Sequence, residues 1–328
     1  MSFHSPLRSI AMLNIDAPTT QASLPFDRLI PALNDAFASG CEVPLRHNHT
    51  VAAKPGTPGD CGTLLLMPAW SVSSGYMGVK TVCVYPGNNR RKLPGLYSTY
   101  ILYSVETGRP LALIDGNEIT SRRTAAASAL GASFLSRKDA RSMLVLGAGR
   151  VASLLPYAYR SVREIERVGV WDINVDQAHR LADRLRADGF DAHVVSRLDA
   201  KTCAVDVISA ATLSTEPLIR REHLSPGTHV DLIGGFTPAM READDACFDG
   251  TAVFVDTEEA ASKAGDLLSP IARGVLARTD IRSDLAGLCR AEHVGRRSAQ
   301  EITVFKAVGT ALEDLAAAAM CFEAVANH

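Results

Sequence analysis

The sequence predicts an α/β protein in which a Rossmann-type, doubly wound parallel sheet is joined to a second, α+β domain. Two observations support this fold class. A chain of 328 residues is too long for one typical hydrophobic core, which favours two domains. The sequence also changes character near Ser142, from short strand-like runs split by turn residues to alternating strand-like and helical runs.

The N-terminal part, residues 1–136, is predicted to contain a helix, a group of strands and a second helix. Apolar residues recur at helical spacing over residues 26–39, and Gly40 ends the pattern. Five short strand-like runs fill residues 43–115, which predicts an antiparallel or mixed sheet. The alanine-rich residues 119–136 are predicted to form the second helix.

The middle of the chain, residues 137–304, alternates strands and helices. A continuous apolar strand starts at Ser142, residues 151–162 are predicted to be helical, and an amphipathic helix over 177–189 follows a second strand. Further apolar runs follow at intervals that leave room for helices. Strands of this buried character and spacing predict a parallel sheet with helices on both faces.

The C-terminal residues 298–326 are rich in alanine and are predicted to form one long helix or two. A helix rich in Ala and Leu needs an apolar surface to pack against. Residues 305–328 are therefore expected to return to the first domain and complete it.

Composition and charge argue against several functions. The net charge of −2 and the absence of a Lys/Arg block argue against nucleic acid as a partner. No apolar run reaches the ~18 residues of a membrane span, and Asn14 and Asp16 interrupt the N-terminal apolar stretch, unlike a signal peptide. Seven dispersed cysteines without a C-x-x-C pair indicate reduced thiols in a cytoplasmic protein. His47 and His49 have no third ligand nearby, so no metal site is expected.

A glycine-rich loop indicates a dinucleotide site. It follows the apolar strand at Ser142 and opens a helix, and an acid, Asp172, ends the next strand. The first glycine permits a tight turn, the second lets a pyrophosphate approach the backbone, and the helix start offers N–H donors to the phosphates. The candidate cofactor-binding residues of the loop are Gly147, Gly149, Arg150, Val151 and Ala152.

The same pattern bears on the choice of cofactor. Asp172 would accept hydrogen bonds from the adenosine ribose and repel a 2′-phosphate, which favours NADH over NADPH unless Arg197 or another arginine offsets it. The nicotinamide of NAD(P)H would lie over the carboxyl ends of the later strands, and ordinary turn chemistry is the alternative interpretation of the residues there. The candidates to line it are the strand ends at residues 209–212 and 234–237, which include Thr212 and Gly234, and Val308 is a further candidate for cofactor binding.

Lys80 is an unusual residue for its surroundings. It interrupts a run of β-branched residues, closed by Pro and Gly, that predicts a strand. A buried ammonium costs several kcal/mol unless an anion pairs with it. Lys80 therefore lies either on a wet face or where a negatively charged ligand binds.

Five motifs in a fixed order resemble the ornithine cyclodeaminase/μ-crystallin family, from about residue 40 to the end. They are GVKTVCVYPGN, RRTAAASALGA, VLGAGRVAS, DLIGGFTPAMRE and EITVFKAVGTALEDLAAA. The resemblance implies a homodimer whose first domain holds substrate and dimer contacts. It also implies that Lys80, Arg123 and Arg46 hold a substrate carboxylate, with Lys80 and Arg123 at the catalytic centre. Three cations without a fixed anion would repel one another, so the empty cleft is expected to be primed for an anion.

Two departures from the family pattern bear on the reaction. Cyclodeaminases carry an aspartate after the Gly-Gly pair and a glutamate before the Met-Pro pair, where this chain has Phe236 and Leu65. Neither side chain can accept a proton, which disfavours ornithine cyclodeamination. The resemblance then implies a ketimine reductase that reduces Δ1-pyrroline-2-carboxylate to L-proline and Δ1-piperideine-2-carboxylate to L-pipecolate, with Phe236 and Leu65 against the ring methylenes.

Two alternatives use the same residues. An alanine-type amino-acid dehydrogenase would hold an open-chain 2-oxo acid with the same cations, and a crystallin-type binding protein would bind the nucleotide without turnover. The proton donor to the ring nitrogen is not evident in the sequence. Lys80 or a bound water is a candidate, although Lys80 could not easily be both a permanent clamp and a free acid.

Overall fold

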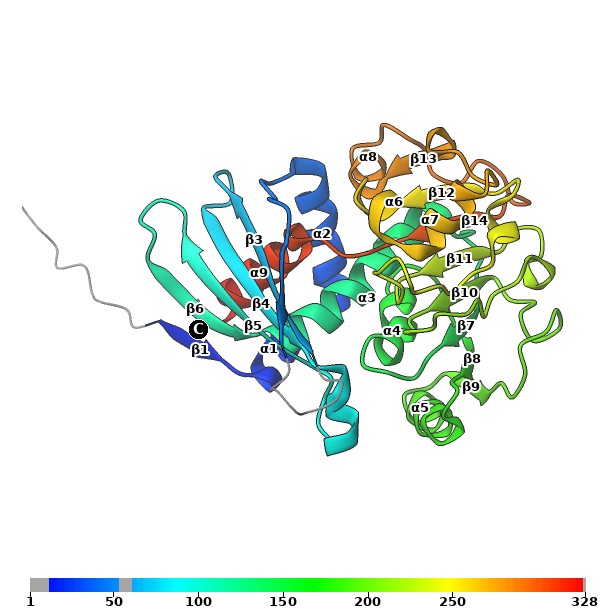
Figure 1. The fold of residues 1–328 in the computed structure, drawn as a ribbon, viewed down its shortest axis with the longest axis horizontal. Helices are drawn as coiled ribbons and strands as arrows, with labels where there is room; N and C mark the ends of the chain where they lie inside the picture. Colours follow the sequence, from blue (N-terminus) through cyan, green and yellow to red (C-terminus); the bar gives the residue numbers. More distant parts are fainter. Residues whose placement is uncertain (1–11, 53–60, 327–328) are drawn as a thin grey trace, which may run out of the picture.

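Two sheets organise the described part of the computed structural model, which comprises residues 12–52 and 61–326 (Figure 1). One sheet has six strands in the order β1-β6-β5-β4-β3-β2, and the other has eight in the order β13-β12-β14-β11-β10-β7-β8-β9. The predicted α/β class is confirmed. Residues 1–11, 53–60 and 327–328, which belong to the predicted first domain, lie outside the described residues.

The six-stranded sheet is mixed, as predicted. Strands β2 to β6 pair antiparallel in sequence order, and β1 adds in parallel beside β6. A 3₁₀ turn over Pro86–Arg91 separates β4 from β5. The strands are β1 (Leu13–Ile15), β2 (His47–Val51), β3 (Gly62–Ser71), β4 (Tyr76–Val84), β5 (Leu96–Ser104) and β6 (Pro110–Asp115).

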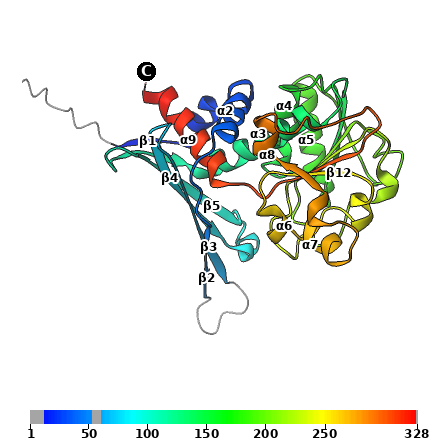
Figure 2. The same ribbon diagram turned by 90° about the horizontal axis from the view of Figure 1, so that it is seen from above.

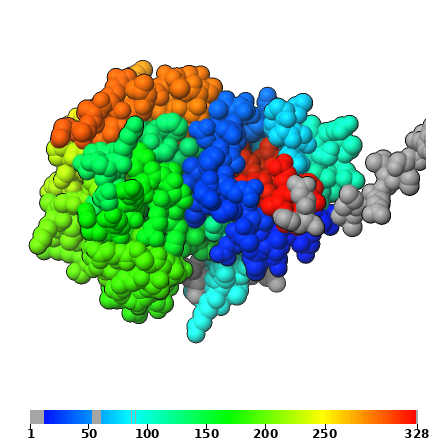
Figure 3. All heavy atoms as spheres, turned by 180° about the vertical axis from the view of Figure 1, so that it is seen from behind, coloured from blue at the N-terminus to red at the C-terminus, as the bar shows by residue number. Residues whose placement is uncertain are grey.

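Helices cover one face of this sheet (Figure 2). They are α1 (Ala17–Ser23), α2 (Phe26–Ser39), α3 (Gly116–Leu135) and α9 (Ala311–Ala326). The carboxylates of Asp16 and Asp115 cap α1 and α3 by accepting hydrogen bonds from backbone N–H groups of the first turn. Helices α2 and α9, from opposite ends of the sequence, lie side by side on the molecular surface (Figure 3).

The eight-stranded sheet is parallel throughout, as predicted for the middle of the chain. Its central strands are completely buried. The strands are β7 (Ser142–Leu146), β8 (Arg167–Trp171), β9 (Asp191–Val194), β10 (Val207–Ala210), β11 (His229–Leu232), β12 (Ala252–Val255), β13 (Ile281–Asp284) and β14 (Thr303–Lys306). The helices around it are α4 (Leu155–Arg160), α5 (Val175–Ala187), α6 (Ala260–Lys263), α7 (Gly265–Ala272) and α8 (Leu285–Cys289).

One predicted element is wrong. Residues 298–326 do not form one or two helices, because Thr303–Lys306 form β14 between β11 and β12, and α9 begins only at Ala311. The β-branched and aromatic residues of Thr303–Lys306 favour a strand, whereas the alanine-rich composition belongs to α9. The proposed domain boundary at 304/305 falls inside this strand.

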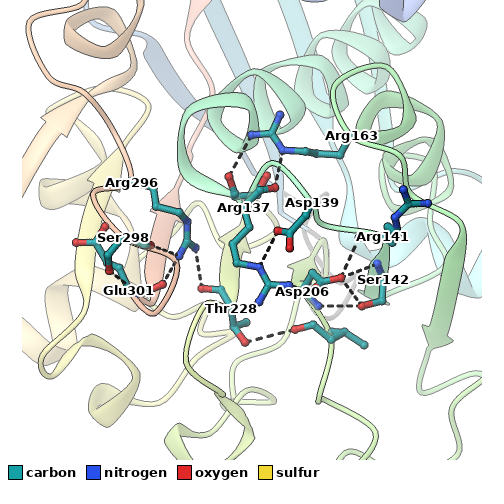
Figure 4. Close-up of polar contacts among 12 residues, drawn as sticks. Arg137, Asp139, Arg141, Ser142, Arg163, Asp206, Thr228, Arg296, Ser298 and Glu301 are labelled. Carbon is teal, nitrogen blue, oxygen red and sulfur yellow. Dashed lines mark hydrogen bonds and ion pairs between the residues drawn. The ribbon is translucent and has the colours of Figure 1, made fainter.

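The junction between α3 and the parallel sheet is held by a polar cluster (Figure 4). Arg163 donates hydrogen bonds to the carbonyl oxygens of Ser133 and Ser136, at 2.7 and 3.1 Å, near the end of α3. The carboxylate of Asp206 accepts from the Arg141 and Ser142 backbone N–H groups, each at 2.9 Å. These bonds satisfy the last carbonyls of α3 and fix its direction relative to β7.

In the described part of the chain, none of the helices combines the length and the apolar character that crossing a bilayer requires.

Candidate active site

A cavity of about 240 Å³ lies between the two sheets, and most of the predicted site residues line it. They come from the segment before β2, from β3, β4 and α3, from the glycine-rich loop, from the ends of β10 and β11, and from the segment after β14. The predicted residues in its lining are Arg46, Leu65, Lys80, Arg123, Arg150, Val151, Thr212, Gly234, Phe236 and Val308. The structure therefore brings the proposed substrate and nicotinamide residues to one place.

Lys80 lies on the inner face of β4, opposite Met67 of β3 and Tyr100 of β5. Its side chain is 2% exposed, and its Nζ forms an ion pair with Asp314 Oδ2 of α9 at 2.7 Å. Burial lowers the pKa of Lys80 to about 8, although Asp314 opposes this shift. A wet face is therefore excluded for Lys80, and the ammonium already has a fixed anion.

Arg123 shares the same acids from its position on α3. Its Nε donates to Asp314 Oδ1 at 2.9 Å, and its Nη1 donates to Glu313 Oε2 at 2.6 Å. Asp314 therefore bridges the lysine and the arginine. Burial alone would raise the pKa of Asp314, but Lys80 and Arg123 together bring it below its ordinary value.

The expectation of three cations without a fixed anion is wrong. Besides the pairs on Lys80 and Arg123, Arg46 donates from Nη2 to Glu259 Oε2 at 3.0 Å and to the Gly309 carbonyl at 2.7 Å. Buried cations without partners would cost several kcal/mol each, so the fold supplies the acids itself. A substrate carboxylate would join these pairs as an additional acceptor.

Glu313 and Asp314 are functional candidates that the sequence reasoning missed. A signal for them was present, because two adjacent acids precede an alanine-rich, apolar run in α9. Carboxylates on a buried helix need cationic partners, and the sequence had already singled out Lys80 and Arg123 as unusual cations. Burial raises the pKa of Glu313 to about 7, and Arg123 opposes this shift.

The glycine-rich loop has the geometry of a phosphate cradle. Gly147 has φ 105°, and a Cβ there would lie 2.8 Å from the Ala211 carbonyl oxygen, so a side chain is excluded. A Cβ built at Gly149 meets no atom within 4 Å, which leaves open space beside the backbone. The loop therefore fits a pyrophosphate. The predicted helix after it begins as a 3₁₀ turn, Ala152–Leu154, before α4.

Asp172 is fixed beside this loop. Its Oδ2 accepts from the Ala148 N–H at 2.7 Å, and its Oδ1 accepts from the Asn174 N–H at 2.7 Å. A second cavity, of about 540 Å³, lies here. The charged residues that line it are Arg150, Asp172, Arg180 and Arg184. Arg150 lines both cavities, so an extended ligand could pass from one to the other along this residue.

A buried acid supports the ends of β10 and β11. Glu242 Oε1 accepts from the Thr212 N–H at 2.7 Å and the Thr212 hydroxyl at 2.9 Å, and its Oε2 accepts from the Gly234 N–H at 2.9 Å. Lys306 of β14 lies 3.9 Å from Glu242 and 2.9 Å from Asp266. Glu242 therefore determines where Thr212, Gly234 and the adjoining Phe236 meet the cavity.

No group of three or more His, Cys, Asp or Glu side chains in residues 12–52 and 61–326 is placed to hold a metal ion. His47 and His49 lie exposed on β2, with ring centroids 6.4 Å apart.

Comparisons with known proteins match nearly the whole chain. A model of the Ornithine cyclodeaminase/mu-crystallin family matches residues 18–328. A relative from Paracoccus denitrificans, named Delta(1)-pyrroline-2-carboxylate reductase, is 40% identical over 86% of this chain and 88% of its own length. Thermococcus litoralis Delta(1)-pyrroline-2-carboxylate reductase, solved with NADH and L-proline, is 30% identical with a TM-score of 0.90, covering 97% of this chain and 98% of that one. An archaeal alanine dehydrogenase dimer with bound NAD is 28% identical with a TM-score of 0.87, covering 96% of each chain.

Proposed function

Because this chain belongs to the Ornithine cyclodeaminase/mu-crystallin family, we propose that it reduces a cyclic imine carboxylate with a nicotinamide cofactor. The proposed reactions are Δ1-pyrroline-2-carboxylate to L-proline and Δ1-piperideine-2-carboxylate to L-pipecolate. The observation that carries the proposal is that Lys80 and Arg123 line the same cavity as Thr212, Gly234 and Phe236. The relatives named for this activity support it.

The cofactor would be held along the path between the two cavities. The phosphates would lie against the open backbone at Gly149, and the ribose hydroxyls would bind Asp172. The nicotinamide would lie beside Thr212, Gly234 and Val308, where it would supply the hydride for C2 of the ring.

The substrate would be oriented by its carboxylate. Asp314 forms an ion pair with Lys80 and with Arg123 and fixes both side chains beside the cavity. An incoming carboxylate would therefore meet two cations in fixed positions. Leu65 and Phe236 would pack against the ring methylenes. Such packing distinguishes rings that differ by one methylene by only about 1–3 kcal/mol, so both ring sizes would be accepted.

We also propose NADH as the preferred cofactor. The two backbone hydrogen bonds on Asp172 hold its carboxylate where the adenosine ribose would lie. A 2′-phosphate in the same place would meet a fixed negative charge. Arg180 and Arg184 line the same cavity, so NADPH would still bind, with weaker affinity.

The decisive experiment follows absorbance at 340 nm with purified protein, NADH or NADPH, and Δ1-pyrroline-2-carboxylate. Oxidation of the cofactor that depends on the imine is the expected result, and the faster cofactor reports the selection made at Asp172. No oxidation with either cofactor would refute the proposed reaction.

An alanine-type dehydrogenase is the second candidate, because the archaeal alanine dehydrogenase shares the fold over almost the whole chain. The same cations would hold the carboxylate of an open-chain 2-oxo acid. Pyruvate with ammonium, tested against the cyclic imines at equal cofactor concentration, distinguishes the two activities. Tight cofactor binding with no turnover of either substrate would instead support a binding protein.

We further propose a homodimer. The helices cover one face of the six-stranded sheet, whereas its other face carries apolar side chains that are half-buried or exposed. These include Leu64, Leu66, Trp70, Val79, Tyr97, Ile101 and Leu113. An apolar sheet face of this kind is suited to cover by a second copy. Light scattering during size-exclusion chromatography measures the mass, and the mass of a single chain would refute the dimer.

A further inference from the structure

Glu313 combines complete burial with access to the substrate cavity. It lies in the first turn of α9, is 0% exposed, and lines the cavity with Lys80 and Arg123. Its Oε2 accepts from Arg123, but its Oε1 has no hydrogen-bond partner among the described residues. A buried oxygen without a partner is costly, and a protonated carboxyl has one hydrogen bond to donate. The free oxygen is therefore suited to face a ligand that accepts a hydrogen bond.

The charges around Glu313 favour its protonated form once a substrate binds. Lys80 and Arg123 contribute two positive charges, and Asp314 contributes one negative charge. A substrate carboxylate would complete a neutral cluster. An ionised Glu313 would leave that cluster with an excess negative charge in a buried cavity, which is unfavourable.

Of the other charged groups near Glu313, Asp256 favours the protonated form further. Asp256 of the loop after β12 is a second buried carboxylate beside Glu313, and it is held by the Val308 and Gly309 N–H groups at 2.8 and 2.7 Å. At the rim, Arg46 is paired with Glu259. Burial, reinforced by Asp256 and Asp314, raises the pKa of Glu313 to about 7, so the acid form is available at neutral pH.

We propose that Glu313 is the catalytic acid that protonates the ring nitrogen of the cyclic imine, an inference that rests on the proposed function. The O–H bond of Glu313 breaks as an N–H bond forms. Bound NADH would supply the hydride: its nicotinamide C4–H bond would break, the electron pair of that bond would form the new C–H bond at C2, NADH would be oxidised to NAD⁺, and the π pair of C=N would move to nitrogen. Water supplies the second proton of the product ammonium and reprotonates Glu313. Lys80 remains paired with Asp314 and is left free of the proton transfer.

The test compares Glu313→Gln with Glu323→Gln, a matched change at an exposed position on the same helix. Glutamine keeps an acceptor for Arg123 but has no acidic proton. We expect kcat of Glu313→Gln to fall by about 10²–10⁴-fold with little change in KM, while Glu323→Gln behaves as wild type. Wild-type kcat/KM should fall as pH rises above about 7, because Glu313 of the substrate-free protein then loses its proton.

A second readout does not depend on turnover. Infrared difference spectra between about pH 6 and pH 8.5 should show a protonated carboxyl band that is absent in Glu313→Gln. The variant is needed for assignment because Glu242 also has a pKa raised to about 7 by burial. A kcat for Glu313→Gln within about threefold of wild type, or an unchanged infrared band, would overturn the inference and leave the proposed function intact. No imine reduction by the wild-type protein would overturn both.

Discussion

Replacing Asp314 with asparagine tests whether this acid holds Lys80 and Arg123 in their buried positions. Asp314 is completely buried and forms an ion pair with each cation. Removing one partner of a buried ion pair costs about 3–5 kcal/mol of folding free energy. We expect Asp314→Asn to lower the free energy of unfolding by about this amount near pH 6.

The share of this cost that belongs to Lys80 can be worked out from its pKa. The pKa is lowered from 10.5 in the unfolded chain to about 8 in the folded protein, so the folded protein loses this proton first and stability rises with pH between those values. In Asp314→Asn the pKa of Lys80 falls further, because its ammonium has lost its anionic partner. Lys80 can then become neutral by losing its proton. The penalty at Lys80 is therefore at most about 1.4 kcal/mol for each pH unit below 8. That limit is about 3 kcal/mol at pH 6, and it falls to zero above pH 8.

Urea denaturation near pH 6 and pH 9 measures this difference. The loss in free energy of unfolding caused by Asp314→Asn should be smaller at the higher pH by up to about 3 kcal/mol. The loss that remains belongs to Arg123. The deficit of Lys80→Met/Asp314→Asn relative to Lys80→Met should depend less on pH, because the Lys80 part is gone and only Glu313, whose pKa Asp314 helps to raise to about 7, still titrates in this range. Glu323→Gln serves as the control for a lost carboxylate on α9. An equal deficit at both pH values, or a double variant as pH-sensitive as the single one, would refute the reasoning.

Three further predictions concern the proposed reaction. Lys80→Ala and Arg123→Ala should each raise KM for the imine by about 10–150-fold, the loss of one charged hydrogen bond, and unchanged KM in both folded variants would contradict the carboxylate site. Phe236→Asp should not release ammonia from ornithine, because Leu65 still occupies the other acidic position; ammonia in the assay would show this to be wrong. Asp172→Ser should raise kcat/KM for NADPH relative to NADH, and an unchanged ratio would remove Asp172 from cofactor selection.

The fold could be predicted where its signals are local in the sequence. The strands of residues 43–115 are separated by turn residues, and the glycine-rich loop joins a strand, a turn and an acid within one short segment. Thr303–Lys306 was missed because a strand of four residues beside an alanine-rich helix has too little periodic pattern of its own. Its assignment as β14 depends on β11 and β12, which lie far away in the sequence.

The cations of the candidate site could be predicted from the sequence, whereas its acidic partners could not. Lys80 is conspicuous because a charged residue interrupts an apolar strand. The partner acids lie at the other end of the chain: Glu313 is 190 residues from Arg123 in sequence, and Asp314 is 191. No local pattern links residues so far apart. Only the packing of α9 against β4 and α3 establishes that the two unusual cations and the two unusual acids neutralise one another.

The segment between β14 and α9 explains why the proposed substrate residues and the proposed cofactor residues share one cavity. Strand β14 lies inside the parallel sheet, between β12 and β11, and the chain then crosses directly to α9, which places Glu313 beside Arg123. Asp256 holds this crossing through the Val308 and Gly309 N–H groups, and a Cβ at Gly309 would overlap the Arg123 guanidinium. A displacement of β14 would therefore also move Glu313 and Asp314, the acids of the proposed substrate site. Dividing the chain after residue 304 would cut through β14, so this boundary does not separate two independent units of structure.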